Sequence, residues 1–472
     1  MAADSFQLVV LGGGPGGYAA AFLGADLGLK TALVDLDENP GGVCLYRGCI
    51  PSKALLHVAK LLHEASAAKA MGVDFGEPKV DLDALRSWKD GVVRKLTGGV
   101  GTLAKSRKVE FVQGRGRFEN AHTMSVELAT GGARTLSFEH AIVATGSLPV
   151  TLPMFDAASP RVLDSTSALA LERVPASMLV VGGGYIGLEL GSVYAALGTK
   201  VSVVEMLSGL VPGADRDLVN VLEKSAGKNF KRIMLETKVT AAREDGEGVH
   251  VTFEGRTSET ARYDSVLVAV GRRPNARDIG LENTRVGVSE RGFVEVDVQR
   301  RSAEPSIFAI GDVVGEPMLA HKASHEGRVA AEVIAGHKVA FEPNAIPAVM
   351  FTDPEIAWCG LTEAQAKEKG VEVEVAKFPW AASGRAMTLE RTDGLTKLIV
   401  DPKTGRLLGV GIAGAGAGDL IAEGALAIEM GALVSDVKLT IHPHPTLSET
   451  VMEAAEVFFG QSTHVYRPKR KR

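Results

Sequence analysis

The sequence is poor in cysteine and in aromatic residues: among 472 residues there are three cysteines, and Phe, Trp and Tyr together make up 5%. A close cysteine pair in a cytosolic chain more often serves catalysis or metal binding than a structural bridge. Membrane spans and export signals are also lacking. No segment reaches the ~18 consecutive apolar residues that cross a bilayer, and a strand pattern starts at Phe6, where a signal region would stand. We therefore expect a cytoplasmic protein with no membrane partner.

An excess of positive charge is absent as well, because 52 Lys and Arg stand against 57 Asp and Glu, which gives a net charge of −5. Nothing in this balance favours nucleic-acid binding. The hydrophobic fraction of 45% and the charged fraction of 23% are ordinary for a soluble globular protein. At roughly 100–200 residues per domain, the length predicts about three domains.

What the sequence does contain is an internal duplication. Residues 8–35 (LVVLGGGPGGYAAAFLGADLGLKTALVD) align with residues 178–205 (MLVVGGGYIGLELGSVYAALGTKVSVVE) at an offset of 170 residues. Each copy is an apolar strand, a G-x-G-x-x-G turn, an amphipathic helix and a second strand that ends in a carboxylate, which is the dinucleotide-binding βαβ fingerprint. A lone fingerprint is a weak signal, but two in register predict two dinucleotides and electron transfer between them.

The residue types of the fingerprint suit a nucleotide. The first glycine permits a tight turn, the second lets the backbone approach a pyrophosphate, and the third lets helix and strand pack closely. Free N–H groups at the helix start bind phosphates, and the carboxylate accepts hydrogen bonds from a ribose. These residues are Gly12, Gly14, Gly17 and Asp35 in the first copy and Gly182, Gly184, Gly187 and Glu205 in the second. Because a carboxylate repels a 2′-phosphate, Glu205 favours NAD over NADP.

A pair of cysteines follows the first copy, in the stretch GGVCLYRGCIPSK at 41–53. Cys44 and Cys49 precede a helix that Pro51 can help to start, and free N–H groups at a helix start lower the pKa of a nearby thiol. A low-pKa thiol is a good leaving group in thiol–disulfide exchange. A metal site would need two further ligands, and no suitably spaced Cys or His pair stands nearby. We interpret the pair as redox-active, and Cys359, in an apolar run, as a small buried hydrophobe.

A third motif is HPHPTLSE at 442–449. A histidine such as His444 can act as a general base near neutral pH, and Glu449, five residues on, would orient it and stabilise its charged form. Taken alone, the motif favours a Pro-rich turn with surface histidines. A His-x-His metal site would lack a third ligand.

The other segments fit a chain of alternating strands and helices. After Pro343 no dinucleotide motif remains, which predicts a separate C-terminal domain. The predicted elements are a helix at Lys53–Lys69, a β-meander at Val109–Ala144, and strands at Val266–Gly271 and Ile307–Asp312.

Together the motifs resemble the class I flavoprotein pyridine nucleotide-disulfide oxidoreductases, and among them the dihydrolipoamide dehydrogenase branch. They occur in one order: the cysteine stretch, ATG at 144–146, the second glycine motif followed by Leu188-Glu189, IFAIGD at 307–312, LAHKASHEG at 319–327, FPWAASGRA at 378–386 and HPHPTLSE. The resemblance implies an α/β fold with two Rossmann-like dinucleotide-binding domains plus a C-terminal α+β dimerisation domain. The expected domains are the first part of an FAD-binding domain (1–147), an NAD-binding domain (148–275), a central domain completing the FAD site (276–344) and a C-terminal dimerisation domain (345–472).

The resemblance also implies residue roles. The FAD site would comprise the first fingerprint (Gly12, Gly14, Gly17, Asp35), Gly116 near the adenine, Asp312 on the ribityl chain, Ala320 through its backbone, and Lys53 near the flavin, paired with Glu189. The NAD site would comprise the second fingerprint (Gly182, Gly184, Gly187, Glu205), Val239 and Gly271. A buried Lys or Glu needs a partner, which independently favours the Lys53–Glu189 pair.

The reaction implied by the resemblance is oxidation of protein-bound dihydrolipoamide to lipoamide, with NAD reduced to NADH through FAD. His444, oriented by Glu449, would deprotonate a substrate thiol, whose thiolate attacks Cys44 and leaves Cys49 as a thiolate against the flavin. The histidine and its glutamate would come from the other subunit of a homodimer. The partners would be lipoyl domains of 2-oxoacid dehydrogenase acyltransferase subunits or the glycine cleavage carrier protein.

One departure from the family, one residue of open role and several alternative functions stand beside this interpretation. The loop between the cysteines carries Tyr46-Arg47 where Asn-Val is common, and Tyr185 after the second glycine motif would either cover the nicotinamide pocket or pack on the flavin domain. Glutathione-type reductases share the cysteine loop but prefer NADP; mercuric and large thioredoxin reductases need a further C-terminal redox pair. A flavin-binding scaffold without turnover would not need the cysteine and histidine motifs. The basic tail Arg467–Arg472 is interpreted as a solubilising end.

Overall fold

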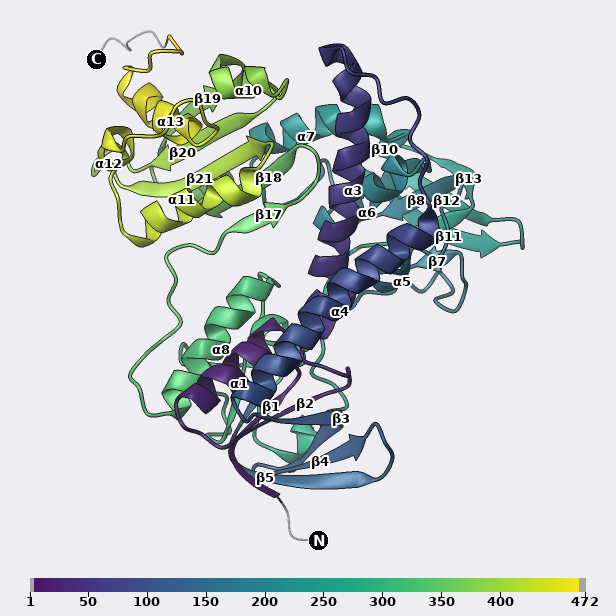
Figure 1. Ribbon diagram of the computed structural model, residues 1–472, viewed down its shortest axis with the longest axis vertical. Coiled ribbons are helices and arrows are strands. Elements are labelled where there is room, and N and C mark those ends of the chain that lie inside the picture. Colours follow the sequence, from purple (N-terminus) through teal and green to yellow (C-terminus); the bar gives the residue numbers. More distant parts are fainter. Residues whose placement is uncertain (1–3, 467–472) are drawn as a thin grey trace.

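Two sheets with parallel strands and a five-stranded antiparallel sheet organise the chain, together with two smaller antiparallel sheets (Figure 1). The computed structural model describes residues 4–466. Each parallel sheet contains one copy of the duplicated motif. The α/β class predicted from the sequence is therefore confirmed. The basic tail discussed above lies outside the described residues.

The first sheet has parallel strands in the spatial order β16, β5, β1, β2, β3. Its inner strands are continuous apolar runs, as expected where both faces are covered. One end of β3 and of β5 belongs to this sheet and the other end pairs with β4, so the predicted meander is found. The strands are β1 (Asp4–Leu11), β2 (Thr31–Asp35), β3 (Glu110–Asn120), β4 (Thr123–Leu128), β5 (Ala133–Val143) and β16 (Ile307–Ala309).

Two helices far apart in the sequence, α1 and α8, lie side by side over this sheet (Figure 1). They approach closely because Gly16 and Gly327 have no side chains: a Cβ at Gly327 would lie 2.5 Å from the Gly16 carbonyl oxygen. The helical segments of this unit are α1 (Pro15–Asp26), α2 (Gly42–Arg47), α3 (Cys49–Ala67), η1 (Ala68–Met71), α4 (Leu82–Ser106), η2 (Leu281–Asn283), η3 (Gly311–Val314) and α8 (Ala320–Ile334).

The long helices α3 and α4 extend from the first unit to the second (Figure 1). Leu55 of α3 and Leu85 of α4 share one hydrophobic core with Leu188 of the second unit. The predicted helix at Lys53–Lys69 corresponds to α3, which begins earlier, at Cys49. The redox loop is therefore continuous with the element that joins the two units.

The second unit repeats the first in its parallel sheet, with strand order β10, β9, β8, β14, β7, and adds a meander, β11–β13. Side chains of the meander and of the parallel sheet form one core. The elements are β7 (Val162–Leu163), α5 (Ser165–Ala170), β8 (Ser177–Val181), α6 (Tyr185–Ala196), β9 (Lys200–Val204), α7 (Arg216–Asn229), β10 (Arg232–Met234), β11 (Thr237–Glu244), β12 (Val249–Gly255), β13 (Glu259–Tyr263) and β14 (Ser265–Val268). A short antiparallel pair, β6 (Ser147–Pro149) and β15 (Arg272–Pro274), links the units.

The C-terminal unit is an antiparallel sheet in the order β17, β18, β21, β20, β19. Helices α11 and α13 pack against it through the core that contains the fully buried Trp380 and the buried Cys359. Its elements are β17 (Ala348–Met350), β18 (Glu355–Gly360), α9 (Glu363–Glu368), β19 (Glu374–Pro379), η4 (Trp380–Ala382), α10 (Gly384–Thr388), β20 (Leu395–Val400), β21 (Leu407–Gly414), α11 (Ala417–Glu429), α12 (Val434–Leu439) and α13 (Glu449–Phe459).

One predicted strand is shorter than expected, and the sequence-based expectation about membrane spans can also be compared with the structure. The strand expected at Ile307–Asp312 ends at Ala309, and Asp312 lies in the short helix η3, because the chain turns at Gly311 with φ of +78°. None of the described helices is both long enough and apolar enough to cross a membrane.

Candidate active site

A cavity of about 410 Å³ lies where the first fingerprint, the cysteine loop and helix α6 of the second unit meet. This volume is in the range of small-molecule sites. The cavity brings together most residues predicted for the flavin and redox site. These are Gly12, Gly14, Asp35, Cys44, Cys49, Lys53, Gly116, Glu189, Asp312 and Ala320.

The glycines of the first fingerprint take the positions that the motif requires. Gly12 has φ of +109°, and a Cβ at Gly17 would overlap the carbonyl oxygen of Gly12. At Gly14, by contrast, a Cβ would meet nothing within 4 Å. The backbone thus packs tightly under the turn and faces open space at the second glycine, which fits the close approach of a pyrophosphate.

Asp35 ends β2 and faces the cavity. Its carboxylate accepts hydrogen bonds from the backbone N–H groups of Gly13 and Asp37. Burial raises the pKa of Asp35, while these two N–H donors counteract the rise. The same carboxylate is placed to accept from a ribose.

The cavity is also lined by Gly116, Asp312 and Ala320. A Cβ at Gly116 would lie 2.6 Å from the Leu11 side chain and 2.9 Å from Met124, so a glycine is needed here for the strand to pack on the core. The Ser147 hydroxyl donates to Asp312 over 2.5 Å, and the Arg272 Nε donates in turn to Ser147 over 2.7 Å. The sequence identifies Asp312, which follows an apolar strand pattern. It does not identify Ser147 and Arg272, which hold Asp312 in place.

Both cysteines are half-buried, so their exposure does not show which sulfur is the more reactive. The pKa values of the two thiols, however, shift in opposite directions. The hydrogen bond from the Cys44 thiol, followed by the positive charge of Lys53, lowers the pKa of Cys49 to about 7. The same thiol–thiol hydrogen bond, with burial, raises the pKa of Cys44. When the reduced pair loses one proton, the thiolate therefore forms on Cys49 and Cys44 keeps its proton.

The Lys53–Glu189 pair expected from the sequence is formed. Lys53 Nζ of α3 lies 2.9 Å and 3.2 Å from the two carboxylate oxygens of Glu189, and 4.5 Å from the ring centroid of Phe351. Glu189 is 3% exposed and also accepts from the backbone N–H of Phe351 over 2.9 Å. The pair therefore joins all three units beside the cysteines.

The second fingerprint repeats the geometry of the first. Gly182 has φ of +107°, and a Cβ at Gly187 would overlap the Gly182 carbonyl, whereas at Gly184 it would meet nothing within 4 Å. The buried Glu205 accepts from the backbone N–H groups of Gly183 over 2.7 Å and Leu207 over 2.8 Å.

The second fingerprint lies outside the cavity, except for the helix that follows it. Tyr185, the first residue of α6, lines the cavity and is 40% exposed. Val239 in β11 and Gly271, after β14, do not line the cavity. The structure thus sets two nucleotide folds against one another, with Tyr185 between them.

The histidine motif lies on the C-terminal unit, away from the cavity lining. His444 Nδ1 is 2.9 Å from Glu449 Oε1, and the His444 side chain is 75% exposed. Partial burial would raise the pKa of Glu449, but the hydrogen bonds from the Thr446 N–H and from His444 outweigh it, and the pKa is lowered. The other histidine, His442, is buried against Glu423 at 2.7 Å. An oriented base is present, but not beside the cysteines of its own chain.

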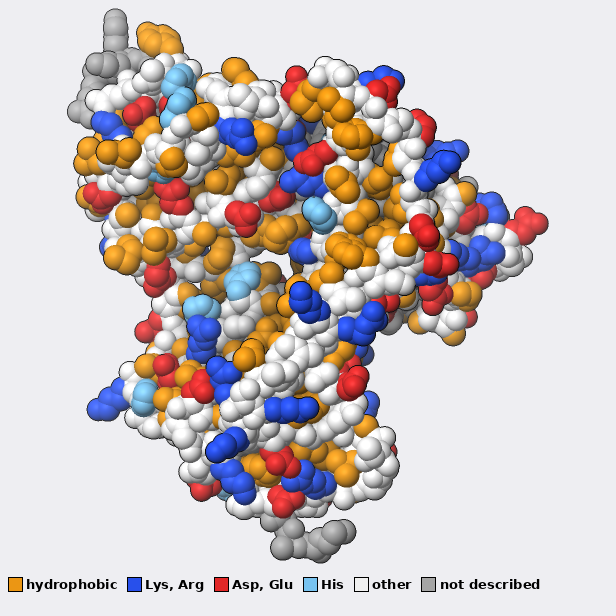
Figure 2. Space-filling view, viewed as in Figure 1, with side chains coloured by type: hydrophobic (Ala, Val, Ile, Leu, Met, Phe, Trp, Pro, Cys, Tyr) orange, Lys and Arg blue, Asp and Glu red, His pale blue; other side chains and the backbone are white. Residues whose placement is uncertain are grey.

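Figure 2 shows hydrophobic side chains scattered over the face of the C-terminal unit that it draws. Several hydrophobic side chains of this unit are exposed. They include Ile441, which is 95% exposed three residues before His444, and Leu426, Met430 and Leu439. Such an apolar surface is typical of a protein–protein interface.

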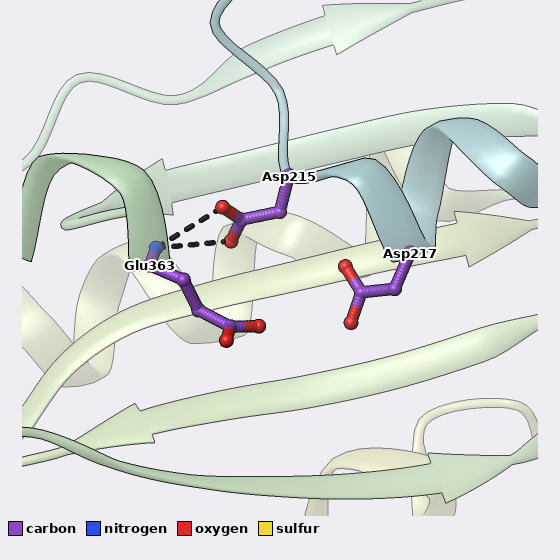
Figure 3. Close-up of side chains that lie close together, drawn as sticks. All are labelled: Asp215, Asp217 and Glu363. Carbon is purple, nitrogen blue, oxygen red and sulfur yellow. Dashed lines mark hydrogen bonds between the residues drawn. The ribbon is translucent and has the colours of Figure 1, made fainter. Parts of the chain in front are cut away.

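A cluster of three carboxylates outside the cavity, from Asp215, Asp217 and Glu363, is drawn in Figure 3. The Glu363 backbone N–H donates to both oxygens of Asp215. The fully buried Lys397 ammonium lies 2.8 Å from Asp215 and 3.0 Å from Asp217 and also contacts Glu363. The Lys397 ammonium thus takes the place that a metal ion would have among these carboxylates. The cluster is an ion-pair network between the second and C-terminal units.

Two contacts of the cysteine loop were not foreseen. The Arg47 guanidinium pairs with the carboxylate of Asp37, and the Tyr46 hydroxyl bonds to the backbone of Asn39. The sequence marks Tyr46-Arg47 only as a departure from the common Asn-Val. A charge of opposite sign ten residues earlier was the available signal for the Arg47 contact.

Comparison with known proteins gives consistent matches over the chain. Residues 6–327 match the family described as pyridine nucleotide-disulphide oxidoreductase, and residues 346–455 match its dimerisation domain. The dihydrolipoyl dehydrogenase of Haemophilus influenzae is 52% identical over 98% of this chain and 97% of its own length. That of Vibrio cholerae is 51% identical over 99% and 98%. The crystal structure of LpdA from Mycobacterium tuberculosis superposes with a TM-score of 0.89 at 27% identity, covering 95% of this chain and 99% of that one.

Proposed function

The chain belongs to the pyridine nucleotide-disulphide oxidoreductase family and is an FAD- and NAD-dependent enzyme that oxidises dihydrolipoamide, and from this premise we propose the roles of its residues and partners. The observation that carries the proposal is the single cavity that unites the first fingerprint, both cysteines and the Lys53–Glu189 pair. FAD supplies a carrier that takes two electrons from the dithiol and passes a hydride to NAD⁺.

Residues of the first unit hold FAD. Gly12, Gly14 and Gly17 shape the turn for its pyrophosphate, Asp35 accepts from the adenosine ribose, and Gly116 lies near the adenine. Asp312, oriented by Ser147, accepts from the ribityl chain, and the Ala320 backbone and Lys53 face the flavin. The open space at Gly14 and the hydrogen bond that orients Asp312 fit this group.

Residues of the second unit hold NAD. Gly182, Gly184, Gly187 and Glu205 provide the turn and the ribose acceptor, with Val239 and Gly271 beside them. Glu205 accepts from a 2′-OH and repels a 2′-phosphate, so NAD is preferred. Tyr185 covers the side of the cavity that the nicotinamide reaches, which accords with its partial exposure there.

The disulfide step runs through Cys44 and Cys49. A substrate thiolate attacks the sulfur of Cys44, the Cys44–Cys49 bond breaks, and Cys49 leaves as a thiolate. The second substrate thiol then closes the lipoamide ring and releases Cys44 as a thiol. The low pKa of Cys49, about 7, makes it the better leaving group.

His444 removes the proton from the attacking substrate thiol, and Glu449 fixes the ring and stabilises its charged form. Because His444 lies on the C-terminal unit and off the cavity, it serves the cavity of a second copy. The match to a dimerisation domain and the exposed apolar side chains near His444 support this homodimer. Each active site is then complete only in the dimer.

The partners are lipoyl domains of 2-oxoacid dehydrogenase acyltransferase subunits, or the glycine cleavage carrier protein, and the reaction takes place in the cytoplasm, where NAD is available. The working units are 1–147 and 276–344 for FAD, 148–275 for NAD and 345–472 for dimerisation. The two ranges matched by the family and by its dimerisation domain support the last boundary.

The purified protein, assayed with free dihydrolipoamide and either NAD⁺ or NADP⁺, tests the proposal. We expect bound flavin, NADH formation and strong preference for NAD⁺. Mixing two inactive variants, Cys44→Ser and His444→Gln, should restore activity through subunit exchange, because one site of each mixed dimer then has both residues. Absence of restored activity in verified mixed dimers would refute the shared site.

A further inference from the structure

The loop at residues 36–41 connects β2 to the cysteine-bearing helix α2. Leu36 and Asp37 line the cavity beside Asp35, and Gly41 donates its backbone N–H to the Gly13 carbonyl over 2.7 Å. One side of the loop thus faces the site proposed for the adenosine of FAD. The other side contacts the redox loop.

Tyr46 fastens the middle of this loop. Its hydroxyl accepts from the Asn39 backbone N–H and donates to the Asn39 carbonyl, each over 3.1 Å. A single side chain therefore satisfies both backbone groups of one loop residue, and it starts from the helix that carries Cys44.

Arg47 fastens the cavity side of the loop. Its two terminal nitrogens donate to the two oxygens of Asp37 over 3.0 Å and 2.6 Å, which is the bidentate geometry of the stronger ion pairs. The Asp37 backbone N–H donates to Asp35. An unbroken series of contacts therefore runs from Arg47 to the carboxylate proposed for the ribose.

Helix α4 closes the remaining side. A Cβ at Gly41 would lie 3.0 Å from the Tyr46 ring and 3.1 Å from Thr97, and a Cβ at Gly101 would overlap the Asn39 side chain. The loop is held between α2 and α4, and α2 itself has only six residues. So short a helix is not stable alone, so its position, and that of Cys44, depends on such contacts.

We propose that Tyr46 and Arg47 are positioning residues that lock the 36–41 loop to the redox helix, so that FAD bound against this loop also fixes Cys44 and Cys49. Both residues lie between Cys44 and Cys49 in the sequence, and the side chains of both contact the 36–41 loop. Coupling of this kind is reciprocal. If bound FAD stabilises the position of the cysteine helix, a correctly placed cysteine helix stabilises bound FAD by the same free energy.

Two measurements on the reduced holoenzyme test this coupling: flavin release after dilution, followed by flavin fluorescence, and the rate of thiol alkylation by iodoacetamide. Arg47→Val and the double change Tyr46→Asn with Arg47→Val, which installs the common Asn-Val, are the test variants. Arg107→Val is the control, because it removes the ion pair to Asp26 in the same unit, away from the cavity. We expect Arg47→Val to release flavin roughly 5- to 10-fold faster and to alkylate faster, with more in the double variant. The control should match the wild type in both.

Rescue separates positioning from general destabilisation. Asp37→Arg should behave like Arg47→Val, and combining Asp37→Arg with Arg47→Asp should restore slow release by re-forming the pair. Unchanged flavin release and alkylation in Arg47→Val, or equal effects in Arg107→Val, would overturn the proposal. The inference rests on FAD lying in the first unit: a wild-type protein that retains no flavin would refute that placement, whereas a flavin-retaining wild type with unaffected variants refutes only the coupling.

Discussion

The two copies of the duplicated motif differ less in their glycines than in the loop that follows the carboxylate. In both, the third glycine of the fingerprint packs against the first. The carboxylate accepts from the N–H of the residue between the first two fingerprint glycines, Gly13 or Gly183, and from the N–H two positions after the carboxylate residue itself. After Asp35 the loop is fastened to α2 by side chains. After Glu205 the corresponding loop is fastened by a side chain of another helix, because Arg216 of α7 donates hydrogen bonds to the backbone carbonyls of Leu210, Val211 and Ala214.

Both loops are therefore fastened, but to different elements. The loop of the first copy is tied to the helix that carries Cys44, whereas the loop of the second copy is tied to α7, which contributes no residue to the cavity. Only the first copy thus links the loop after its carboxylate to the helix that carries a cysteine.

The largest expected effect lies in neither nucleotide unit. His444→Gln should slow dihydrolipoamide oxidation by about 10²–10⁴-fold, because it removes the general base. Flavin content and NADH-driven reduction of an artificial acceptor should stay normal. Steady-state kinetics in both directions check this. An unimpaired variant would leave HPHPTLSE as a structural turn and place proton transfer elsewhere.

Substitution of matching glycines should break the equivalence of the two units. Gly17→Ala and Gly187→Ala each place a Cβ against a backbone carbonyl of the same turn, with a cost of about 1–3 kcal/mol, which corresponds to roughly 5- to 150-fold in binding. The Gly17 variant should lose flavin and all activity. The Gly187 variant should keep its flavin, still be bleached by dihydrolipoamide, and fail in NADH formation. Loss of flavin from the Gly187 variant would contradict the assignment of the units.

The thiol titration belongs to the first unit alone. Cys49 has a pKa lowered to about 7, so in the reduced enzyme the thiolate is present above about pH 7 and is lost below it. Since the Cys44 hydrogen bond is the main cause, Cys44→Ala should move the midpoint upward, toward the ordinary cysteine value of about 8.5. Cys44→Ser retains a donor and should shift it less. Thiolate absorbance as a function of pH measures this, and an unchanged midpoint in Cys44→Ala would mean that Lys53 alone lowers the pKa.

The smallest expected effect concerns nucleotide choice. Glu205→Gln should lower the preference for NAD⁺ over NADP⁺ by roughly tenfold, through a weaker acceptor for the 2′-OH and loss of the negative charge. Asp35→Asn, its counterpart, should leave this preference unchanged and weaken FAD binding instead. The ratio of kcat/KM for the two coenzymes checks both. A wild-type enzyme that turned over NADP⁺ as well as NAD⁺ would refute the role of Glu205.

Elements fixed by local sequence could be predicted well. The first helix of each copy is an example: α1 covers Pro15–Asp26 and α6 covers Tyr185–Ala196, so their bounds differ by the same 170 residues as the motif itself. The turn glycines and the apolar strand determine the start of each helix within a few residues. The positions of Asp35 and Glu205 follow from the same local pattern.

Features that depend on distant residues could not be predicted. Asp312 was assigned to a strand end, but its helical turn depends on packing after Gly311, and its partner Ser147 is 165 residues away. The Arg47–Asp37 pair requires α2 and the preceding loop to lie side by side, which no periodicity encodes. The separation of His444 from the cavity of its own chain was implied by the family resemblance and not by the residues alone, because it follows from domain placement.

Glu189 limits how freely such a duplicated architecture can be recombined. Its carboxylate receives Lys53 from the flavin unit and the Phe351 amide from the C-terminal unit, although it belongs to the NAD unit. A chimera that exchanged residues 148–275 for the matching segment of a relative without this glutamate would leave a lysine beside the disulfide without its carboxylate and an amide without its acceptor. Grafting of nucleotide specificity between relatives should therefore succeed only when this one acidic side chain is carried along.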